Sequence, residues 1–404
     1  MTLPSNDSLP TLASLRGMTA AQQQALGCAD TLREILQQPA TWRATAGSQG
    51  ALHRAALDHA LAARPAQIAI TGSGSSVYVG EALAPVLQAE LGIPVRAVAA
   101  GDLLTHLQGS LPMASAGGRS GAVDGADGLL ISIARSGDSP ESVGAVDAVL
   151  ARAPGWRHLV ITCHVQGRLA TRYRDEPRVG VVVLDPRTND RSLVMTSSFT
   201  NMLLAGSALG ATRPADGAAA LVERVFDLYA DALAAMAAGE RDTAVYLGSA
   251  GAYGAARESA LKMLEMSGGD TVTLAETFLG FRHGPMAWLN RGGVLVAYLS
   301  GDAGIRAYEA DLLRELDAKS LGATRIVVGE DVGADLAGPH GLAIELPGLY
   351  ALPPAQQLLV HTVVGQLFAF FRCLQLGHRP DTPSEGVLTR VVGEFTLHDG
   401  GAAA

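Results

Sequence analysis

The chain has 404 residues, a length at which a single hydrophobic core usually gives way to two or more domains. Hydrophobic residues make up 48% of it and charged residues 17%, which is typical of a globular protein and argues against disorder along the whole chain. The formal net charge is −9, and an acidic chain is poorly suited to neutralise the phosphates of a nucleic acid. We therefore expect two globular domains and no nucleic-acid partner.

The three cysteines, Cys28, Cys163 and Cys373, are far apart and contain no CxxC pair. An odd number of scattered cysteines predicts reduced thiols and neither a disulfide framework nor a zinc site. The sequence also has no HxxxH motif, so we expect no metal and no other cofactor. The first residues contain no apolar run of signal-peptide length, and no uncharged apolar stretch is long enough to span a bilayer. These features predict a cytoplasmic protein without a membrane partner.

Helices are expected first along the chain. Helical spacing predicts one or two helices over residues 18–38, with Pro39 as a stop, and another over residues 49–63. From residue 67 onward, short apolar runs alternate with helical stretches, which is typical of a parallel sheet covered on both faces. In the first half these runs lie at residues 67–70, 95–99, 128–133, 158–162 and 180–184.

The second half repeats this plan, with apolar runs at residues 244–247 and 293–299. The first Gly-rich turns of the two halves, at Gly72 and Gly248, are 176 residues apart. That interval is too long for a solenoid and indicates a duplicated α/β domain. We expect the Ala-rich stretch 206–239 to be a helical link between the copies. The Gly-, Ser- and Ala-rich stretch from Gly109 to Asp127 is expected to be a long, mobile surface loop.

Three turns rich in Ser and Thr follow the apolar segments of the first half, at residues 71–76, 135–141 and 195–200. Hydroxyls and backbone N–H groups at the start of a helix can hold a phosphate without a fixed positive charge. Each turn also has a simpler interpretation, since Gly permits tight turns and Ser, Thr or Asp can cap the next helix. In a parallel sheet, however, the turns would meet at the carboxyl edge, where α/β folds bind ligands.

Together with these turns, three segments resemble the double sugar isomerase (SIS) domain family, which includes the isomerase half of glucosamine-6-phosphate synthase. The segments are residues 192–199, 257–265 and 279–285, and the resemblance extends over residues 51–390. It is greatest to the galactosamine-6-phosphate deaminase/isomerase group, formerly described as tagatose-6-phosphate ketose/aldose isomerases. It implies two doubly wound parallel-sheet domains of the flavodoxin-like three-layer type. The expected division is an N-terminal helical segment (1–50), a phosphosugar-binding domain (51–212), a catalytic domain (213–378) and a tail that closes the site (379–404).

The resemblance assigns substrate binding to hydroxyls of the first-half turns. Ala134 stands where the family often has a further Ser, and Arg135 could compensate by pairing with the phosphate. The C-terminal lysine that forms a Schiff base in the synthase is absent. Arg390 lies near its place and cannot form a Schiff base, but it could bind the phosphate or the open-chain sugar. The hydroxyl candidates are Ser73, Ser75, Ser136, Ser139, Thr196 and Ser197.

The catalytic candidates lie in the second half. Glu258, Lys262 and Glu265 share one face of an otherwise apolar helix, and spacing alone favours a solvated ion-paired face. The resemblance instead implies that Glu265 is the base that transfers the proton, Lys262 supports the enolate oxygen and Glu258 is their acidic partner. His283 could be a structural hydrogen-bonding residue, but it matches the histidine that opens the sugar ring in a neighbouring subunit. A homodimer is therefore expected.

The implied reaction converts D-galactosamine 6-phosphate into D-tagatose 6-phosphate and ammonia. We expect ammonia to be released and not installed, because the chain has no room for the glutaminase domain of the synthase. Three alternatives remain open: a plain aldose–ketose phosphate isomerase, a deglycase of sugar-amine 6-phosphates, and a non-catalytic sugar-phosphate sensor with the same fold. The combination of Glu265, Lys262 and His283 favours an enzyme over a sensor, which has no need of a base at carbon 2.

Overall fold

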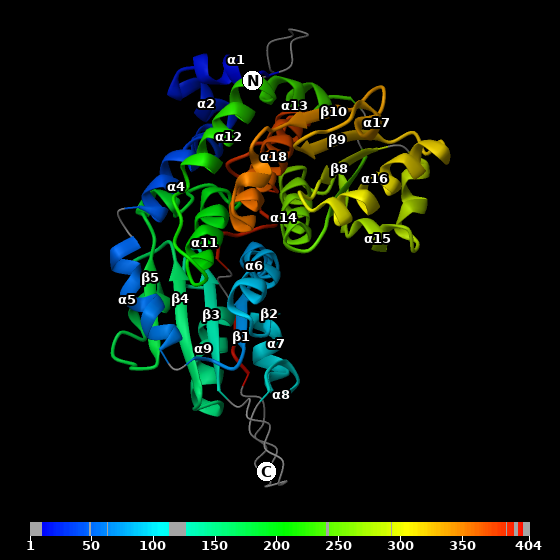
Figure 1. Cartoon of the computed structure of the whole chain (residues 1–404). Helices are drawn as coiled ribbons and strands as arrows, with labels where there is room; N and C mark the ends of the chain where they lie inside the picture. The colour runs from blue at the N-terminus through cyan, green and yellow to red at the C-terminus, as the bar shows by residue number, and fades with distance from the viewer. Residues whose placement is uncertain are drawn as a thin grey trace.

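The computed structural model describes residues 10–47, 50–62, 64–112, 127–239, 242–291, 293–384, 386–391 and 395–398. In this part of the chain there are two five-stranded parallel sheets, each flanked by helices on both faces (Figure 1). The predicted doubly wound α/β architecture is therefore confirmed. Most of the segment between Gly109 and Asp127 lies outside the described residues.

Five helices precede the first sheet. They are α1 (Leu12–Gly17), α2 (Ala20–Leu26), α3 (Ala29–Leu36), α4 (Gln38–Ala46) and α5 (Gly50–Leu61). The helix before Pro39 ends as expected, but the helical region continues, because Pro39 lies in the first turn of α4. Proline is tolerated there, since the first turn of a helix does not use its N–H groups for internal hydrogen bonds.

The first sheet contains five strands and the helices that connect them. The strands are β1 (Ile68–Gly72), β2 (Val95–Ala99), β3 (Gly128–Ala134), β4 (Trp156–Thr162) and β5 (Val179–Val183). The helices are α6 (Ser75–Leu91), α7 (Ala100–Thr105), α8 (Leu107–Ser110), α9 (Pro140–Arg152) and α10 (Arg168–Thr171), and the short 3-10 helix η1 (Pro186–Thr188) follows β5. The strand order is β2-β1-β3-β4-β5, and every residue of β1 and β3 is buried. The turns after these two central strands thus open at the carboxyl edge of the sheet.

The second sheet has the same topology. Its strands are β6 (Thr243–Gly248), β7 (Val272–Glu276), β8 (Val294–Tyr298), β9 (Thr324–Gly329) and β10 (Leu342–Glu345). The connecting elements are α14 (Gly251–Met266), α15 (Phe278–Phe281), η2 (Pro285–Arg291), α16 (Ala303–Ala318), α17 (Ala334–Ala337) and η3 (Leu349–Ala351). The order is β7-β6-β8-β9-β10, so β1 corresponds to β6 and α6 to α14. The identical strand order supports the expected duplication.

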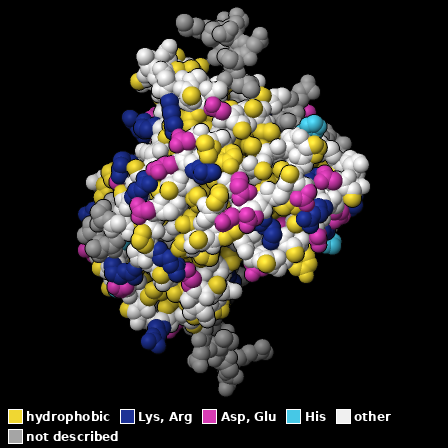
Figure 2. All heavy atoms as spheres, turned by 45° about the horizontal axis from the view of Figure 1, so that its top comes forward, with side chains coloured by type: hydrophobic (Ala, Val, Ile, Leu, Met, Phe, Trp, Pro, Cys, Tyr) yellow, Lys and Arg dark blue, Asp and Glu magenta, His cyan; other side chains and the backbone are white. Residues whose placement is uncertain are grey.

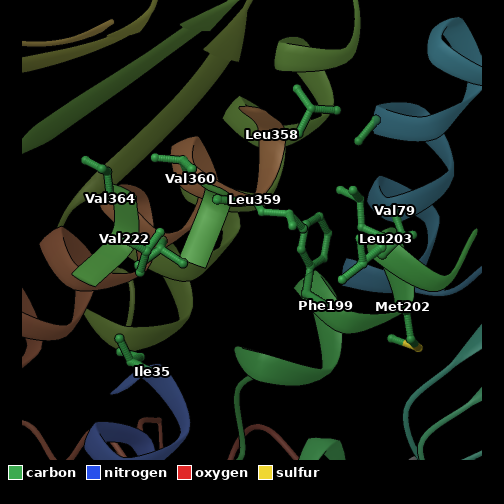
Figure 3. Close-up of a cluster of buried hydrophobic side chains, with 14 of the residues drawn as sticks. Ile35, Val79, Phe199, Met202, Leu203, Val222, Leu358, Leu359, Val360 and Val364 are labelled. Carbon is green, nitrogen blue, oxygen red and sulfur yellow. The ribbon is translucent and has the colours of Figure 1, made fainter. Parts of the chain in front are cut away.

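One apolar core joins the two halves. Around it lie α11 (Ser197–Ser207), α12 (Asp216–Leu228), α13 (Ala230–Ala237) and α18 (Pro354–Gln375). Figure 3 shows side chains of α18, α12, α11, α6 and α3 converging on this core, among them Leu359, Val222 and Phe199. Helix α18 is long and apolar enough to cross a membrane, but 94% of its most apolar window is buried inside the protein. Its apolar character is therefore explained by its position at the centre of the core.

Charges of both signs mix on one face of the molecule. On the face drawn in Figure 2, Lys and Arg side chains are interspersed with Asp and Glu. This pattern differs from the basic stripe that a nucleic-acid-binding face presents.

Candidate active site

Helices α6 and α14 pack backbone to backbone in opposite directions. A Cβ atom on Gly254 would lie 2.4 Å from the backbone nitrogen of Ala82, so only glycine permits this approach. The close packing brings the third quarter of α14 to the first residue of α6, where Lys262 Nζ donates a hydrogen bond of 3.1 Å to Ser75 Oγ. A catalytic candidate of the second half thus meets a phosphate-site candidate of the first.

The charged face of α14 points into the protein and not into solvent. Glu258 is 0% and Lys262 1% exposed, whereas the Glu265 side chain is 23% exposed. Lys262 Nζ lies 3.5 Å from Glu258 Oε1 and is also ion-paired with Glu265. The interpretation of this stripe as a solvated ion-paired face is therefore wrong.

Burial and neighbouring charges shift the pKa values of Glu258 and Lys262. Burial raises the pKa of Glu258 to about 8, with the charge of Glu265 adding to the effect and the nearby ammonium of Lys262 opposing it. Burial disfavours the charged form of Lys262, but the two carboxylates outweigh it and raise the pKa of the lysine. Near pH 7 this leaves a protonated Glu258 beneath an ammonium–carboxylate pair of Lys262 and Glu265. Of the three groups, Glu265 has the carboxylate that a substrate can reach.

The hydroxyls of the first two turns are not used as helix caps. Neither α6 nor α9 has a side-chain hydrogen bond at its N-cap, so the interpretation of these two turns as side-chain caps is wrong. Ser136 Oγ instead accepts a hydrogen bond of 3.2 Å from the backbone N–H of Asp138. Ser73 is exposed and Ser75 is buried against Lys262.

Arg135 ties three segments together. Arg135 is 7% exposed, and its guanidinium donates to the carbonyl oxygens of Ser192 at 3.2 Å, Leu193 at 2.9 Å and Arg390 at 3.4 Å. Burial lowers the pKa of Arg135. The exposed side chain of Arg390 donates to Asn189 Oδ1 at 2.5 Å. Both arginines therefore hold the C-terminal tail against residues 189–193, the segment that leads to the third turn.

His283 is not brought to Glu265 within one chain. It is exposed, directly after α15, and Phe278 and Phe281 of α15 pack with Val245 and Leu247 on one face of the second sheet. Side chains of α14 pack on the opposite face, against the residues that alternate with these, such as Tyr246. The imidazole makes no hydrogen bond among the described residues.

Comparisons with known proteins identify the family to which the chain belongs. No protein-family model matches the chain. A Streptomyces coelicolor protein provisionally assigned as D-galactosamine-6-phosphate deaminase AgaS is 39% identical over 381 residues, which cover 91% of this chain and 95% of the relative. The D-galactosamine-6-phosphate deaminase AgaS of Escherichia coli O157:H7 is 33% identical, with the same coverage. This chain belongs to the AgaS family. Among solved structures, a tagatose-6-phosphate ketose/aldose isomerase from Escherichia coli matches with a TM-score of 0.81 at 29% identity, over 95% of this chain and 99% of that one.

The predicted family and fold are thus confirmed, and the AgaS-family chain contains site-supporting residues that the sequence did not indicate. Asp190 is fully buried beneath the third turn. Its carboxylate accepts hydrogen bonds from Thr196 N at 2.8 Å, Ser197 Oγ at 2.5 Å, Ser198 N at 2.9 Å and Ser198 Oγ at 2.6 Å. Asp190 therefore fixes the conformation of the third turn. Thr196 Oγ1 is buried without a hydrogen-bond partner among the described residues.

Glu34, on α3, supports the same turn from the N-terminal helices. It is 1% exposed and accepts from the backbone N–H of Arg191 at 2.6 Å and from the side chain of Ser192. Burial and the nearby charge of Asp190 raise the pKa of Glu34 to about 7. The helices before the first sheet are thus part of the support for the AgaS-family site.

The described residues contain no group of three or more His, Cys, Asp or Glu side chains arranged to hold a metal ion. All three cysteines are buried and free, and burial raises the pKa of Cys28 and Cys163 to about 12.

Proposed function

We propose that this AgaS-family protein is a hexosamine-6-phosphate deaminase/isomerase that converts D-galactosamine 6-phosphate into D-tagatose 6-phosphate and ammonia. The substrate is the one that its relatives' names carry. The supporting observation in the chain itself is the Ser75–Lys262–Glu265 contact, which places a partly exposed carboxylate and a buried ammonium beside a hydroxyl-rich turn. We also propose that the protein acts in the cytoplasm.

The chemistry starts with opening of the sugar ring, for which we assign the partner subunit's His283 as the proton shuttle. Glu265 then removes the proton from carbon 2, which the adjacent carbonyl acidifies, and Lys262 stabilises the negative charge that develops on the oxygen. Glu265 returns the proton to carbon 1, and a second proton passes from the nitrogen to the oxygen of carbon 1, which leaves an imine at carbon 2. Water adds to that imine, and ammonia departs as the ketose phosphate forms. Glu258, protonated and buried, keeps Lys262 in place without a second full negative charge.

We assign the phosphate to the three turns of the first half. The N-termini of α6 and α9, which carry no side-chain caps, supply N–H groups and positive dipole ends. Arg135 and Arg390 would fix the segments around it and add positive charge. The hydroxyls that we assign to the substrate are those of Ser73, Ser75, Ser136, Ser139, Thr196 and Ser197.

We propose a homodimer in which each His283 serves the neighbouring site. The proposal is supported by the position of His283, exposed on the face of the second sheet that is opposite to Glu265.

The test is ammonia release from galactosamine, glucosamine and mannosamine 6-phosphates, with Glu265→Gln assayed in parallel. We expect release from galactosamine 6-phosphate and a loss of about 10²- to 10⁴-fold in kcat for the variant, the usual contribution of general acid–base catalysis. Full activity of Glu265→Gln would contradict the mechanism. Ketose formation without ammonia would identify a plain isomerase, release of an amino acid from a fructosamine 6-phosphate would identify a deglycase, and binding without turnover would identify a sensor.

A further inference from the structure

A second pocket lies at the other end of the α6–α14 pair. It has a volume of about 440 Å³, within the range of small-molecule sites, and opens at the carboxyl ends of β6 and β8. The C-terminal part of α6, the first turn of α14, η3 and the start of α18 form its walls. We call it the second-half pocket, and the residues that the argument uses are Val86, Ala89, Ser249, Ser300, Glu309 and His361.

The second-half pocket is the counterpart of the candidate active site. The strand order of the two sheets is the same, and the 176-residue interval pairs Lys262 with Val86 and Glu265 with Ala89. Val86 and Ala89 both line the pocket. The positions that carry the ammonium and the proposed carboxylate base in one site are therefore apolar in the other, so the second-half pocket lacks the counterparts of Lys262 and Glu265.

A carboxylate occupies the position of an anion in this pocket. Ser249 Oγ donates to Glu309 Oε1 at 2.7 Å, and the backbone N–H of Ser300 donates to Glu309 Oε2 at 2.8 Å. Ser249 and Ser300 begin the turns after β6 and β8, the places that correspond to the phosphate turns of the first half. Glu309 is 1% exposed, so its own charge takes up the donors that a phosphate would need.

The remaining charges also disfavour a phosphate. Glu90 and Asp302 line the pocket beside Glu309, and its described lining contains no Lys or Arg. Two arginines lie close to this lining: Arg213 is ion-paired with Glu90 at 2.7 Å, and Arg306 donates hydrogen bonds to the carbonyl oxygen of Ser300 at 2.9 Å and to Tyr350 Oη. The three lining carboxylates outnumber these two arginines, so the lining favours a cation over an anion.

His361 provides a buried group that lacks a partner. It is 2% exposed, lines the pocket, and stacks on Tyr298 with ring centroids 5.0 Å apart. Neither ring nitrogen has a hydrogen-bond partner among the described residues. Burial lowers the pKa of His361 to about 3, so at pH 7 the neutral ring offers one N–H donor and one lone pair. A buried polar group without a partner is costly, and a ligand hydroxyl would satisfy it.

We propose that the second-half pocket binds a small hydroxylated amine, such as an unphosphorylated amino sugar. Its ammonium group would face Glu309 and Asp302, its hydroxyl would pair with His361, and its carbon skeleton would contact Val86 and Ala89. The site thus selects against the phosphate on which the candidate active site depends.

The test is calorimetric titration of D-galactosamine into Glu265→Gln, which removes turnover and leaves the second-half pocket unchanged. We expect saturable binding that His361→Phe, built on the same background, weakens by tenfold or more. We expect at least tenfold weaker binding of D-galactose, which lacks the ammonium group. Ser75→Ala is the matched control, because it alters the candidate active site alone and should leave this affinity within twofold. Absence of binding, or binding that depends on Ser75 and not on His361, would overturn the proposal.

A second variant covers the case in which His361→Phe does not fold. Ala89 is exposed on α6, so Ala89→Trp can fill the pocket without disturbing the core. It should abolish binding of D-galactosamine and leave turnover of galactosamine 6-phosphate within twofold of the wild type. Binding that survives Ala89→Trp would contradict the proposal. Because affinity is read without turnover, its failure is distinct from failure of the proposed reaction.

Discussion

The two ends of the α6–α14 pair have the same architecture and opposite chemistry. At one end, Ser75 in the first turn of α6 contacts Lys262 of α14, which is ion-paired with Glu265. At the other end, the first turn of α14 meets Val86 and Ala89 of α6, and a carboxylate takes the hydrogen-bond donors. A duplicated fold therefore supplies two equivalent positions on the helix pair, and we propose that the side chains of the partner helix decide which of them can catalyse a reaction.

The largest expected effect is a loss of ammonia release, and it tests whether Glu265 and His283, on opposite faces of the second sheet, serve the same site. Glu265→Gln and His283→Ala should each lose about 10²- to 10⁴-fold in ammonia release, since each removes a proton-transfer group. The two variants are then mixed in equal amounts and allowed to exchange subunits. Half of the dimers should be mixed, and each mixed dimer has one intact site out of two. The mixture should therefore recover about a quarter of wild-type activity.

The control for this mixture is Glu265→Gln combined with a Glu265→Gln/His283→Ala double variant, which cannot form an intact site. Recovery in that control, or none in the first mixture, would contradict shared sites. Sedimentation of the wild type as a monomer with full activity would have the same consequence.

The next effect compares Lys262 with its counterpart Val86. Lys262→Met should lower kcat by about 10²- to 10³-fold, as removal of one group that stabilises a developing oxyanion does. The fold should survive, because burial already favours the protonated Glu258 that the change leaves behind. Val86→Met should change kcat by less than about twofold, since it alters the apolar end of the pair. Ammonia release gives kcat, circular dichroism verifies folding, and a Lys262→Met enzyme within tenfold of wild type would contradict the role.

A smaller effect compares the carboxylates that hold the turns of the two halves. Asp190→Asn should destabilise the protein by about 2–4 kcal/mol, because an amide cannot accept all four hydrogen bonds that reach Asp190. It should also raise KM by displacing Thr196 and Ser197. Glu309→Gln, which disturbs two hydrogen bonds, should cost less and leave KM unchanged. Urea unfolding measures the loss of stability of each variant, and steady-state kinetics measure its KM. Equal KM shifts in the two variants would contradict the distinction between a first half whose turns bind substrate and a second half whose turns do not.

The central strands and the family could be predicted from the sequence because their signals are local. Continuous apolar runs marked β1 to β6 and β8, and residues 95–99 agree with β2 to the residue. Strands β7 and β10 gave no such run, because most of their residues are only half-buried at the sheet edges. Strand β9 was also missed, although most of it is buried.

The support of the site could not be predicted, because its contacts are distant in sequence. Spacing placed Glu258, Lys262 and Glu265 on one face of a helix but could not say that the face is buried, since that depends on how close Gly254 lets α6 approach. Glu34 contacts Ser192, which is 158 residues away in the sequence. Asp190 accepts hydrogen bonds from a turn rich in hydroxyls, and an exposed loop could contain the same residues. Neither residue has a periodicity that distinguishes it from an ordinary surface acid.

The smallest expected effect concerns pH and Glu34. Its pKa rises from an ordinary value of 4.5 to about 7 in the folded protein, so the folded state binds the proton more tightly than the unfolded state. The resulting stabilisation is complete below pH 4.5 and is lost as the pH rises through 7. Glu34→Gln cannot titrate, so the fall in unfolding free energy between pH 5 and pH 8 should be smaller by on the order of 1 kcal/mol than in the wild type. Urea titrations at both pH values measure it, with exposed Glu223→Gln as the control. An unchanged pH dependence in Glu34→Gln would mean that Glu34 is ionised throughout, held so by the donors of the turn that it supports.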